Sequence, residues 1–258
     1  MEQITRDVVL CGKYATGYQE GRPVPATYLW RDDTKRSPYE PPVEWLDGLT
    51  VSLVNCWSSN YFHWLLENLT QLLCIDPAKI DNIIVGTAHH PRVRTSLEHL
   101  GLAGKIHWWD WRKPMGVNLL SYGPQRVEGY SYMPGLERLI DAFKQKATGP
   151  RSIFVDREGA NVRRMVNIEA FLKAHKSYKC ITPNGTVTEQ AAYFGNAKRI
   201  TGPHGAGLTN MIWAKKCKIT DLYGNYYNDC FRKLAGQLGH EYEAVQCKAV
   251  GEDMVWEG

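Results

Sequence analysis

Three arginines and a glycine-rich turn are the residues of this chain whose types and spacing could do chemistry together. Arg157, Arg163 and Arg164 lie within eight residues, directly after the apolar run Ser152–Val155. A guanidinium keeps its charge at any working pH and offers a planar fork of donors, so the three suit a diphosphate. The alternative is a solvated basic loop. We favour a ligand site because open α/β sheets collect their ligands at the carboxyl ends of parallel strands.

The glycine-rich turn spans Thr201 to Asn210 and reads TGPHGAGLTN. This pattern predicts a strand that ends in a turn and opens a helix. Gly205 and Gly207 lack a β-carbon, so the backbone there can approach a ligand closely or take positive φ. The first N–H groups of the following helix have no partners within it, and a phosphate would satisfy them. Such turns also join strands to helices for purely steric reasons, and that alternative stays open.

Other side chains of the same two segments are candidates for this site. His204 could donate a hydrogen bond to the diphosphate, or a charge when protonated. Asn167 and Asn210 could bond sugar or phosphate oxygens, while Thr209 could do the same or cap the helix. The predicted donor-binding set is therefore Arg157, Arg163, Arg164, Asn167, His204, Gly205, Ala206, Gly207, Thr209 and Asn210.

A histidine and a glutamate lie one helical turn apart in an earlier segment. His63, Glu67 and Thr70 repeat at helical spacing beside an apolar stripe, and Ser58 to Asn60 can cap the helix. Histidine titrates near neutral pH, and a carboxylate beside it can hold one tautomer. We therefore predict that His63 is a general base oriented by Glu67. Glu67 as the base, or a purely structural histidine, are the alternatives.

Together these segments resemble glycosyltransferase family 61, which includes plant β-1,2-xylosyltransferase, EGF-domain O-linked N-acetylglucosaminyltransferase and capsule-synthesis proteins. The resemblance is carried by NYFHWLLE at 60–67, by Arg157 with RRMVNIE at 163–169, and by PHGAGLTN at 203–210. It implies the GT-B architecture, in which two Rossmann-like domains face across a cleft. It also implies a nucleotide-sugar donor and inversion at the anomeric carbon.

The predicted function follows from this resemblance. We expect an inverting glycosyltransferase that moves a sugar of the xylose or N-acetylglucosamine type from a nucleotide diphosphate donor, a UDP-sugar, to a hydroxyl of a glycan or glycoconjugate acceptor. The alternative is a catalytically inactive nucleotide- or glycan-binding protein of the same fold. The only adjacent aspartate pair, Asp32 and Asp33, lies in an irregular leading segment. Because arginines can neutralise the diphosphate, we predict no essential metal or cofactor, although divalent metal dependence stays open.

Composition places the chain among ordinary globular proteins. Of 258 residues, 43% are hydrophobic and 22% charged, and a net charge of +4 is too small to indicate a nucleic-acid partner. The sequence has no apolar run of about 18 residues and no signal-like N-terminus, so we expect a cytoplasmic protein without a transmembrane segment. The seven cysteines include no close pair suited to zinc.

Strand and helix patterns alternate along most of the chain, which favours an α/β fold with parallel sheets. The first 50 residues are rich in turn formers and predict a short strand ribbon with irregular segments. Helix-ending and turn signals at Lys146–Pro150 predict a boundary there, with an acceptor-side domain at 1–148 and a nucleotide-sugar-binding Rossmann-like domain at 149–258. Strands are expected at 49–56, 82–85, 105–109, 118–122, 152–155, 178–182, 198–201, 218–222 and 242–246. Helices are expected at 61–75, 91–100, 135–147, 167–175, 187–196, 208–214 and 229–238.

Overall fold

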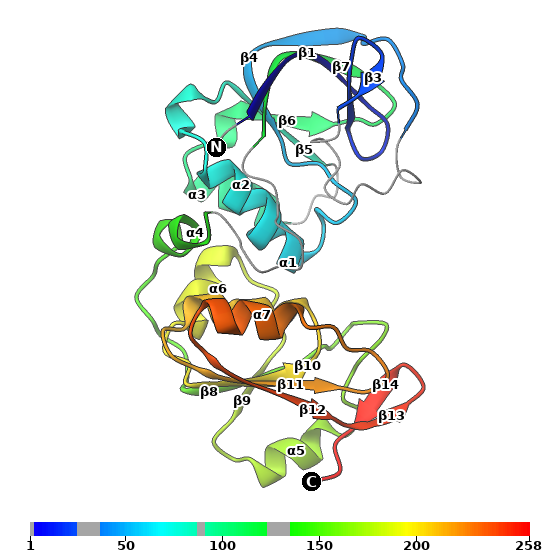
Figure 1. Ribbon diagram of the computed structural model, residues 1–258. Helices are drawn as coiled ribbons and strands as arrows, with labels where there is room; N and C mark the ends of the chain where they lie inside the picture. The colour runs from blue at the N-terminus through cyan, green and yellow to red at the C-terminus, as the bar shows by residue number, and fades with distance from the viewer. Residues whose placement is uncertain (1–2, 25–36, 87–90, 123–134) are drawn as a thin grey trace. The chain divides into compact units, whose positions relative to one another are not determined.

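The computed structural model describes residues 3–24, 37–86, 91–122 and 135–258. The described residues form two compact units, one reaching Ala142 and the other beginning at Phe143. Each unit has its own sheet, as Figure 1 shows, and its own buried core. Asp32 and Asp33 lie outside the described residues. Both units contain helices and parallel strands, so the predicted α/β class is confirmed.

The first unit is built on a seven-stranded mixed sheet with the order β3-β2-β1-β7-β4-β5-β6. The strands β6-β5-β4-β7 run parallel in the order of the first four strands of a Rossmann sheet. Strand β1 pairs antiparallel with β7, so the predicted N-terminal ribbon extends the sheet. The strands are β1 (Gln3–Cys11), β2 (Thr16–Gln19), β3 (Arg22–Pro23), β4 (Glu44–Ser52), β5 (Asn82–Gly86), β6 (Ile106–Trp109) and β7 (Met115–Tyr122).

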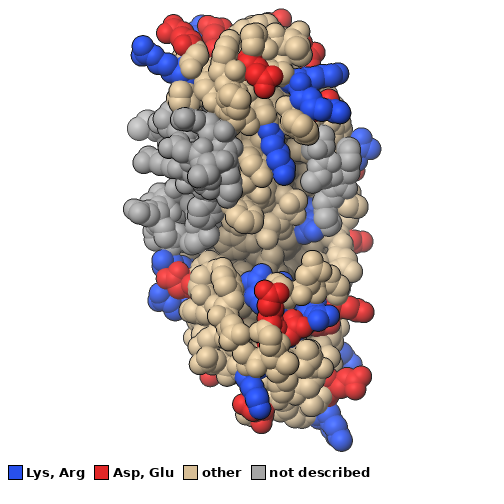
Figure 2. Space-filling view, turned by 90° about the vertical axis from the view of Figure 1, so that its right-hand side faces the viewer, with Lys and Arg blue, Asp and Glu red and all other residues tan. Residues whose placement is uncertain are grey.

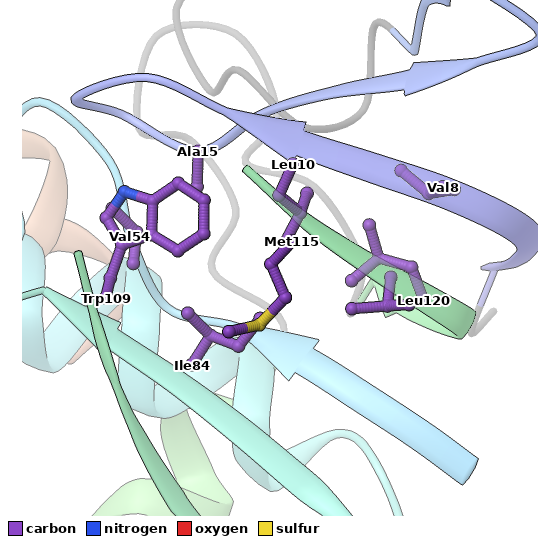
Figure 3. Close-up of a cluster of buried hydrophobic side chains, with 9 residues drawn as sticks. Val8, Leu10, Ala15, Val54, Ile84, Trp109, Met115 and Leu120 are labelled. Atoms are coloured by element: carbon purple, nitrogen blue, oxygen red, sulfur yellow. The ribbon is translucent and has the colours of Figure 1, made fainter. Parts of the chain in front are cut away.

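This sheet curls around an apolar core. The indole N–H of Trp109, at the end of β6, donates to the Gly12 carbonyl at 2.9 Å, although β6 and β1 stand four places apart in the sheet. Figure 3 shows the side chains gathered between the curled strands. The cluster comprises Val8, Leu10, Ala15, Val54, Ile84, Trp109, Met115, Val117 and Leu120. Removing this apolar surface from water is the main favourable contribution to the stability of the unit.

The helix predicted at 61–75 is present but divided into three parts. It consists of α1 (Tyr61–His63), a π-helical segment Trp64–Leu69 and α2 (Thr70–Leu73). The Asn60 side chain caps it by accepting the Phe62 N–H at 2.9 Å. All six residues of the π-helical segment are buried, Glu67 among them, and π turns frequently mark functional sites. The other helices of the unit are α3 (Pro91–His99) and α4 (Leu136–Ala142), with 3₁₀ turns at Pro77–Lys79 and Ala103–Lys105.

The second unit is a five-stranded parallel sheet with the order β12-β11-β10-β8-β9. Figure 1 shows α5 on one face of this sheet and α6 and α7 on the other. The strands are β8 (Ser152–Val155), β9 (Lys179–Ile181), β10 (Arg199–Pro203), β11 (Lys218–Tyr223) and β12 (Glu241–Gln246). The helices are α5 (Ile168–Ala174), α6 (Val187–Phe194), a 3₁₀ helix Ala206–Trp213 and α7 (Cys230–Gln237). This is a doubly wound order, numbered 2-1-3-4-5 along the sheet.

A hairpin that the sequence patterns did not indicate follows the parallel sheet. It consists of β13 (Lys248–Val250) and β14 (Asp253–Val255). Its second half runs beside the arginine-bearing loop after β8, because the Arg163 N–H donates to Glu252 at 2.8 Å and the Met254 N–H to Arg164 at 2.9 Å. The hairpin therefore fixes the backbone of that loop.

Candidate functional site

The two segments singled out in the sequence follow adjacent strands of the second unit. Strand β8 ends at Val155 and strand β10 at Pro203, and the two strands pair directly in parallel. Strand β9 lies on one side of β8, and β10, the next strand along the chain, lies on the other side of β8. The strand order therefore reverses between β8 and β10, which makes this point the topological switch point of the sheet. Ligands of doubly wound sheets bind at the carboxyl ends of the strands at such a point. The sheet order therefore places the arginine loop and the glycine turn where a ligand is expected.

Arg157 and Gly205 are in direct contact across this point. A β-carbon on Gly205 would lie 1.8 Å from Nη1 of Arg157, so the guanidinium occupies the space above the glycine. The Nε of Arg157 donates to the Val162 carbonyl at 3.3 Å. Burial lowers the pKa of the Arg157 guanidinium to about 10, and the nearby charge of Arg163 acts in the same direction. Arg157 therefore remains a cation at neutral pH.

Arg157 and Arg163 share an uncommon electrostatic setting. Among the described residues, no carboxylate forms an ion pair with either guanidinium, although both side chains are partly buried. Arg163 lies with its guanidinium carbon 4.9 Å from the centre of the Tyr226 ring. Its backbone has a φ of 60°, a left-handed conformation that L-residues rarely adopt and that is often found where a ligand is clamped. Asp156 and Asp253 are near enough to act on the charge of Arg157, but neither forms an ion pair with it, so the two neighbouring cations suit an anion.

Arg164 is held differently from the other two arginines. Its guanidinium donates to Asp253 Oδ2 at 2.6 and 3.0 Å, and its N–H donates to Asp253 Oδ1 at 2.8 Å. These hydrogen bonds lower the pKa of Asp253, so the carboxylate is ionised at neutral pH. Arg164 thus joins the loop to the β13–β14 hairpin, while Arg163 next to it has no such partner. The sequence alone does not distinguish the two.

Gly205 and Gly207 lie where neighbouring atoms leave no room for a β-carbon. Neither Gly205 nor Gly207 adopts the left-handed conformation that favours glycine, because the φ of 171° at Gly205 is extended backbone. A β-carbon on Gly207 would lie 2.6 Å from Cγ1 of Val155. The helix expected at 208–214 is a 3₁₀ helix over Ala206–Trp213, with Ala206 as its first residue. Close packing against β8 and Arg157, one of the two explanations given by the sequence pattern, accounts for both glycines.

This packing predicts the effect of Gly205→Ala. The added methyl group would occupy the position of the Arg157 guanidinium, while the extended backbone tolerates alanine. For UDP, the nucleotide expected from the sequence, we therefore expect a folded protein with an affinity lower by about tenfold or more. Isothermal titration with UDP measures the change. Gly236→Ala in α7 is the matched control, because nothing lies within 4 Å of the added carbon. Unchanged UDP affinity in Gly205→Ala would contradict a site at this contact.

His204 occupies the first position after β10 and is almost fully buried, with 1% of its surface exposed. Its Nδ1 lies 2.8 Å from Oδ2 of Asp221 in β11, and its N–H donates to the Leu222 carbonyl at 2.7 Å. The rings of Tyr226, Tyr227 and Phe231 surround the imidazole, with centres 5.1 to 5.6 Å away. The imidazole is therefore fixed beside the Arg157–Gly205 contact.

The polar side chains of the two segments are largely engaged within the unit. Asn167 exchanges two hydrogen bonds with the backbone of Trp256, at 2.8 and 2.9 Å. Asn210 donates to Gln190 and to the Gly207 carbonyl, and accepts the indole N–H of Trp213. Thr209 is fully buried, and its hydroxyl has no hydrogen-bond partner among the described residues. These contacts give the two asparagines roles in shaping the loops.

His63 and Glu67 form a second candidate site, in the first unit. Nδ1 of His63 lies 2.9 Å from Oε2 of Glu67, four residues further along the same helical segment. The side chain of Glu67 is 3% exposed and that of His63 12%, so the histidine is the more accessible of the pair. Trp57, which is 42% exposed, stacks on the imidazole at 5.6 Å between ring centres. Sequence reasoning placed Glu67 on a polar stripe and did not predict its burial.

Figure 2 shows basic and acidic side chains interspersed on the described part of the face it presents. Within the described residues, no helix is long and apolar enough to cross a membrane. The same residues contain no group of three His, Cys, Asp or Glu side chains that could hold a metal ion.

A comparison with protein families decides the class of the protein. The sequence model of the family described as Glycosyltransferase 61 matches residues 61–220, which include both candidate sites. The chain belongs to the glycosyltransferase 61 family. No curated protein gives a match. Membership confirms the resemblance found in the sequence and identifies the chain as a glycosyltransferase, which acts on a sugar donor and an acceptor.

The hydrogen bonds around His204 involve two residues that the sequence reasoning missed. Asp221 lies just beyond the matched segment and contacts His204 within the sheet. The available signal was a charged residue inside the apolar strand segment Ile219–Leu222. Tyr242 of β12 bonds to the same carboxylate at 2.8 Å. Neither Asp221 nor Tyr242 lies at a sequence spacing from His204 that would indicate contact. The order of the strands in the sheet brings both residues to the site.

Proposed function

We propose that this protein is an inverting glycosyltransferase that uses a UDP-sugar, with a donor of the xylose or N-acetylglucosamine type and a glycan or glycoconjugate hydroxyl as acceptor. The observation that carries the proposal is the contact of Arg157 with Gly205 at the switch point of a doubly wound sheet. Two guanidiniums at this position, neither of them in an ion pair among the described residues, favour a diphosphate, the leaving group of a nucleotide-sugar donor.

In this proposal the second unit binds the donor. Arg157 and Arg163 would bind the diphosphate oxygens, with His204 and the N–H groups that follow Gly205 completing the site. Negative charge accumulates on the diphosphate as its bond to the anomeric carbon breaks. Preorganised cations lower the free energy of that transition state without requiring a metal ion.

The first unit would supply the base for the acceptor. As the acceptor oxygen bonds to the anomeric carbon, the hydroxyl proton would pass to Nε2 of His63, and the electron pair of the breaking bond would remain on the diphosphate. The close contact between Nδ1 and Glu67 favours the tautomer that leaves Nε2 as the acceptor. We accordingly assign acceptor binding to residues 1–148 and donor binding to residues 149–258, the division that GT-B transferases use.

Turnover separates this proposal from a protein that only binds nucleotides. The wild-type chain is incubated with UDP-xylose, UDP-N-acetylglucosamine and GDP- and CMP-sugars, with release of the nucleotide and the anomeric configuration of the product recorded by NMR. We expect UDP release with inversion, and stabilisation of the fold by UDP. Binding of UDP without transfer or slow hydrolysis of any donor would identify an inactive binding protein. Product with retained configuration would overturn the proposed mechanism.

A further inference from the structure

A chain of hydrogen-bonded polar groups joins β12, β11 and the residue that follows β10 in the second unit. Tyr242 in β12 donates its hydroxyl to Oδ2 of Asp221 in β11 at 2.8 Å, and the same oxygen lies 2.8 Å from Nδ1 of His204 at the end of β10. Asp221 is 0% exposed and His204 1%. Nothing in the sequence spacing indicates this arrangement, because each residue comes from a different strand.

The carboxylate of Asp221 is incompletely satisfied. Both hydrogen bonds reach Oδ2, and Oδ1 is buried without a hydrogen-bond partner among the described residues. A buried carboxylate is stabilised by hydrogen bonds to its oxygens, and an oxygen without a hydrogen-bond partner makes a nearby positive charge more favourable. Burial, with the nearby Tyr227 hydroxyl and the charge of Asp221, raises the pKa of Tyr242, which therefore acts as a neutral donor. The imidazole of His204 is the remaining group that can supply a positive charge.

The groups around His204 limit what it can do. Asp221 faces it from β11, Tyr226 and Tyr227 face it from the loop after β11, and Arg157 lies against the adjacent Gly205. A carboxylate can only accept a hydrogen bond, so Nδ1 carries a proton and Nε2 is the nitrogen left for a ligand. A diphosphate can only accept hydrogen bonds as well, and it would bind to Nε2 when that nitrogen also carries a proton.

We propose that Asp221, held by Tyr242, is a positioning residue that fixes the tautomer of His204 and provides the counter-charge for His204 to take up a proton when a diphosphate binds. The proposal rests on the proposed function of the donor site. It makes His204 a third cation beside Arg157 and Arg163, formed when the diphosphate is present. The step moves one proton from solvent to Nε2, and no covalent bond to the ligand is involved.

Proton uptake on UDP binding tests this role. Titration calorimetry at pH 8 in two buffers of different ionisation enthalpy gives the number of protons taken up per UDP bound. We expect uptake approaching one proton for the wild-type chain, and a value near zero for both Asp221→Asn and His204→Gln. Asp229→Asn, which removes an exposed carboxylate of the same unit, is the matched control and should retain the wild-type value. Equal uptake in the wild-type chain and Asp221→Asn would overturn the role of Asp221.

A second experiment uses only the wild-type chain, so its result does not depend on whether the variants fold. Nitrogen-15 NMR of the free wild-type chain reports the tautomer of His204, and we expect the pattern of an Nδ1-protonated ring. A ring that carries its proton on Nε2 and none on Nδ1 would overturn the proposal, and no variant is needed to observe it. Failure of the wild-type chain to bind UDP would instead overturn the proposed function and, with it, the ligand-linked role of His204. The two failures are therefore distinguishable.

Discussion

Replacing Arg157 by glutamine is expected to weaken UDP binding by about one to two orders of magnitude. Hydrogen bonds to a charged partner contribute roughly 1.5–3 kcal/mol, and about 1.4 kcal/mol corresponds to a factor of ten in affinity. The guanidinium is partly buried and forms no ion pair, so its removal relieves the desolvation that lowers its pKa to about 10 and offsets the loss of its hydrogen bond to the Val162 carbonyl. The folded chain should therefore change little in stability, and the loss should appear in the dissociation constant of UDP measured by calorimetry.

Arg199→Gln is the matched control for this prediction. Arg199 begins strand β10 and donates to Ser152 at the start of β8, so it lies on the same two strands at the edge opposite to the site. Its replacement removes the same charge from the unit, and we expect stability to change while UDP affinity stays within about twofold. Equal losses of affinity in the two variants would indicate a general charge effect, and would count against a specific contact with Arg157.

Much of the fold follows from local patterns in the sequence. The strand segments β5, β8, β10 and β11 alternate with amphipathic stretches, and each lies between turn signals, so their order and type are predictable. The glycine turn could be placed at a strand end for the same reason. Local patterns also indicated that Arg157 follows the end of β8.

The remainder depends on contacts between residues distant in the sequence. The antiparallel attachment of β1 to β7, and the pairing of the arginine loop with Glu252 and Met254, join segments about 90 or more residues apart. No pattern within one window specifies such a pairing, so neither could be predicted. The same holds for Asp221, which only the order of the sheet brings to His204. The different settings of Arg163 and Arg164 follow from one such contact, with Asp253.

Replacing His63 by asparagine is expected to lower kcat by about 10² to 10⁴-fold while leaving the dissociation constant of UDP unchanged. General-base assistance contributes a rate factor of this size, and His63 belongs to the first unit, whereas the proposed diphosphate contacts belong to the second. Asparagine can still donate to Glu67, so the buried carboxylate keeps a partner and the fold should persist. Turnover and binding are measured on the same preparation, with circular dichroism to confirm folding.

A second variant decides between the two candidate bases. Glu67→Gln keeps the size and hydrogen-bonding capacity of the side chain but removes its charge. If His63 is the base, this variant should retain more turnover than His63→Asn, because the imidazole is still present and has lost only the group that orients it. His99→Asn, which changes a histidine in α3 of the same unit, should behave as wild type. A deeper loss in Glu67→Gln than in His63→Asn would transfer the role of base to the glutamate, since removing an orienting group cannot cost more than removing the base it orients.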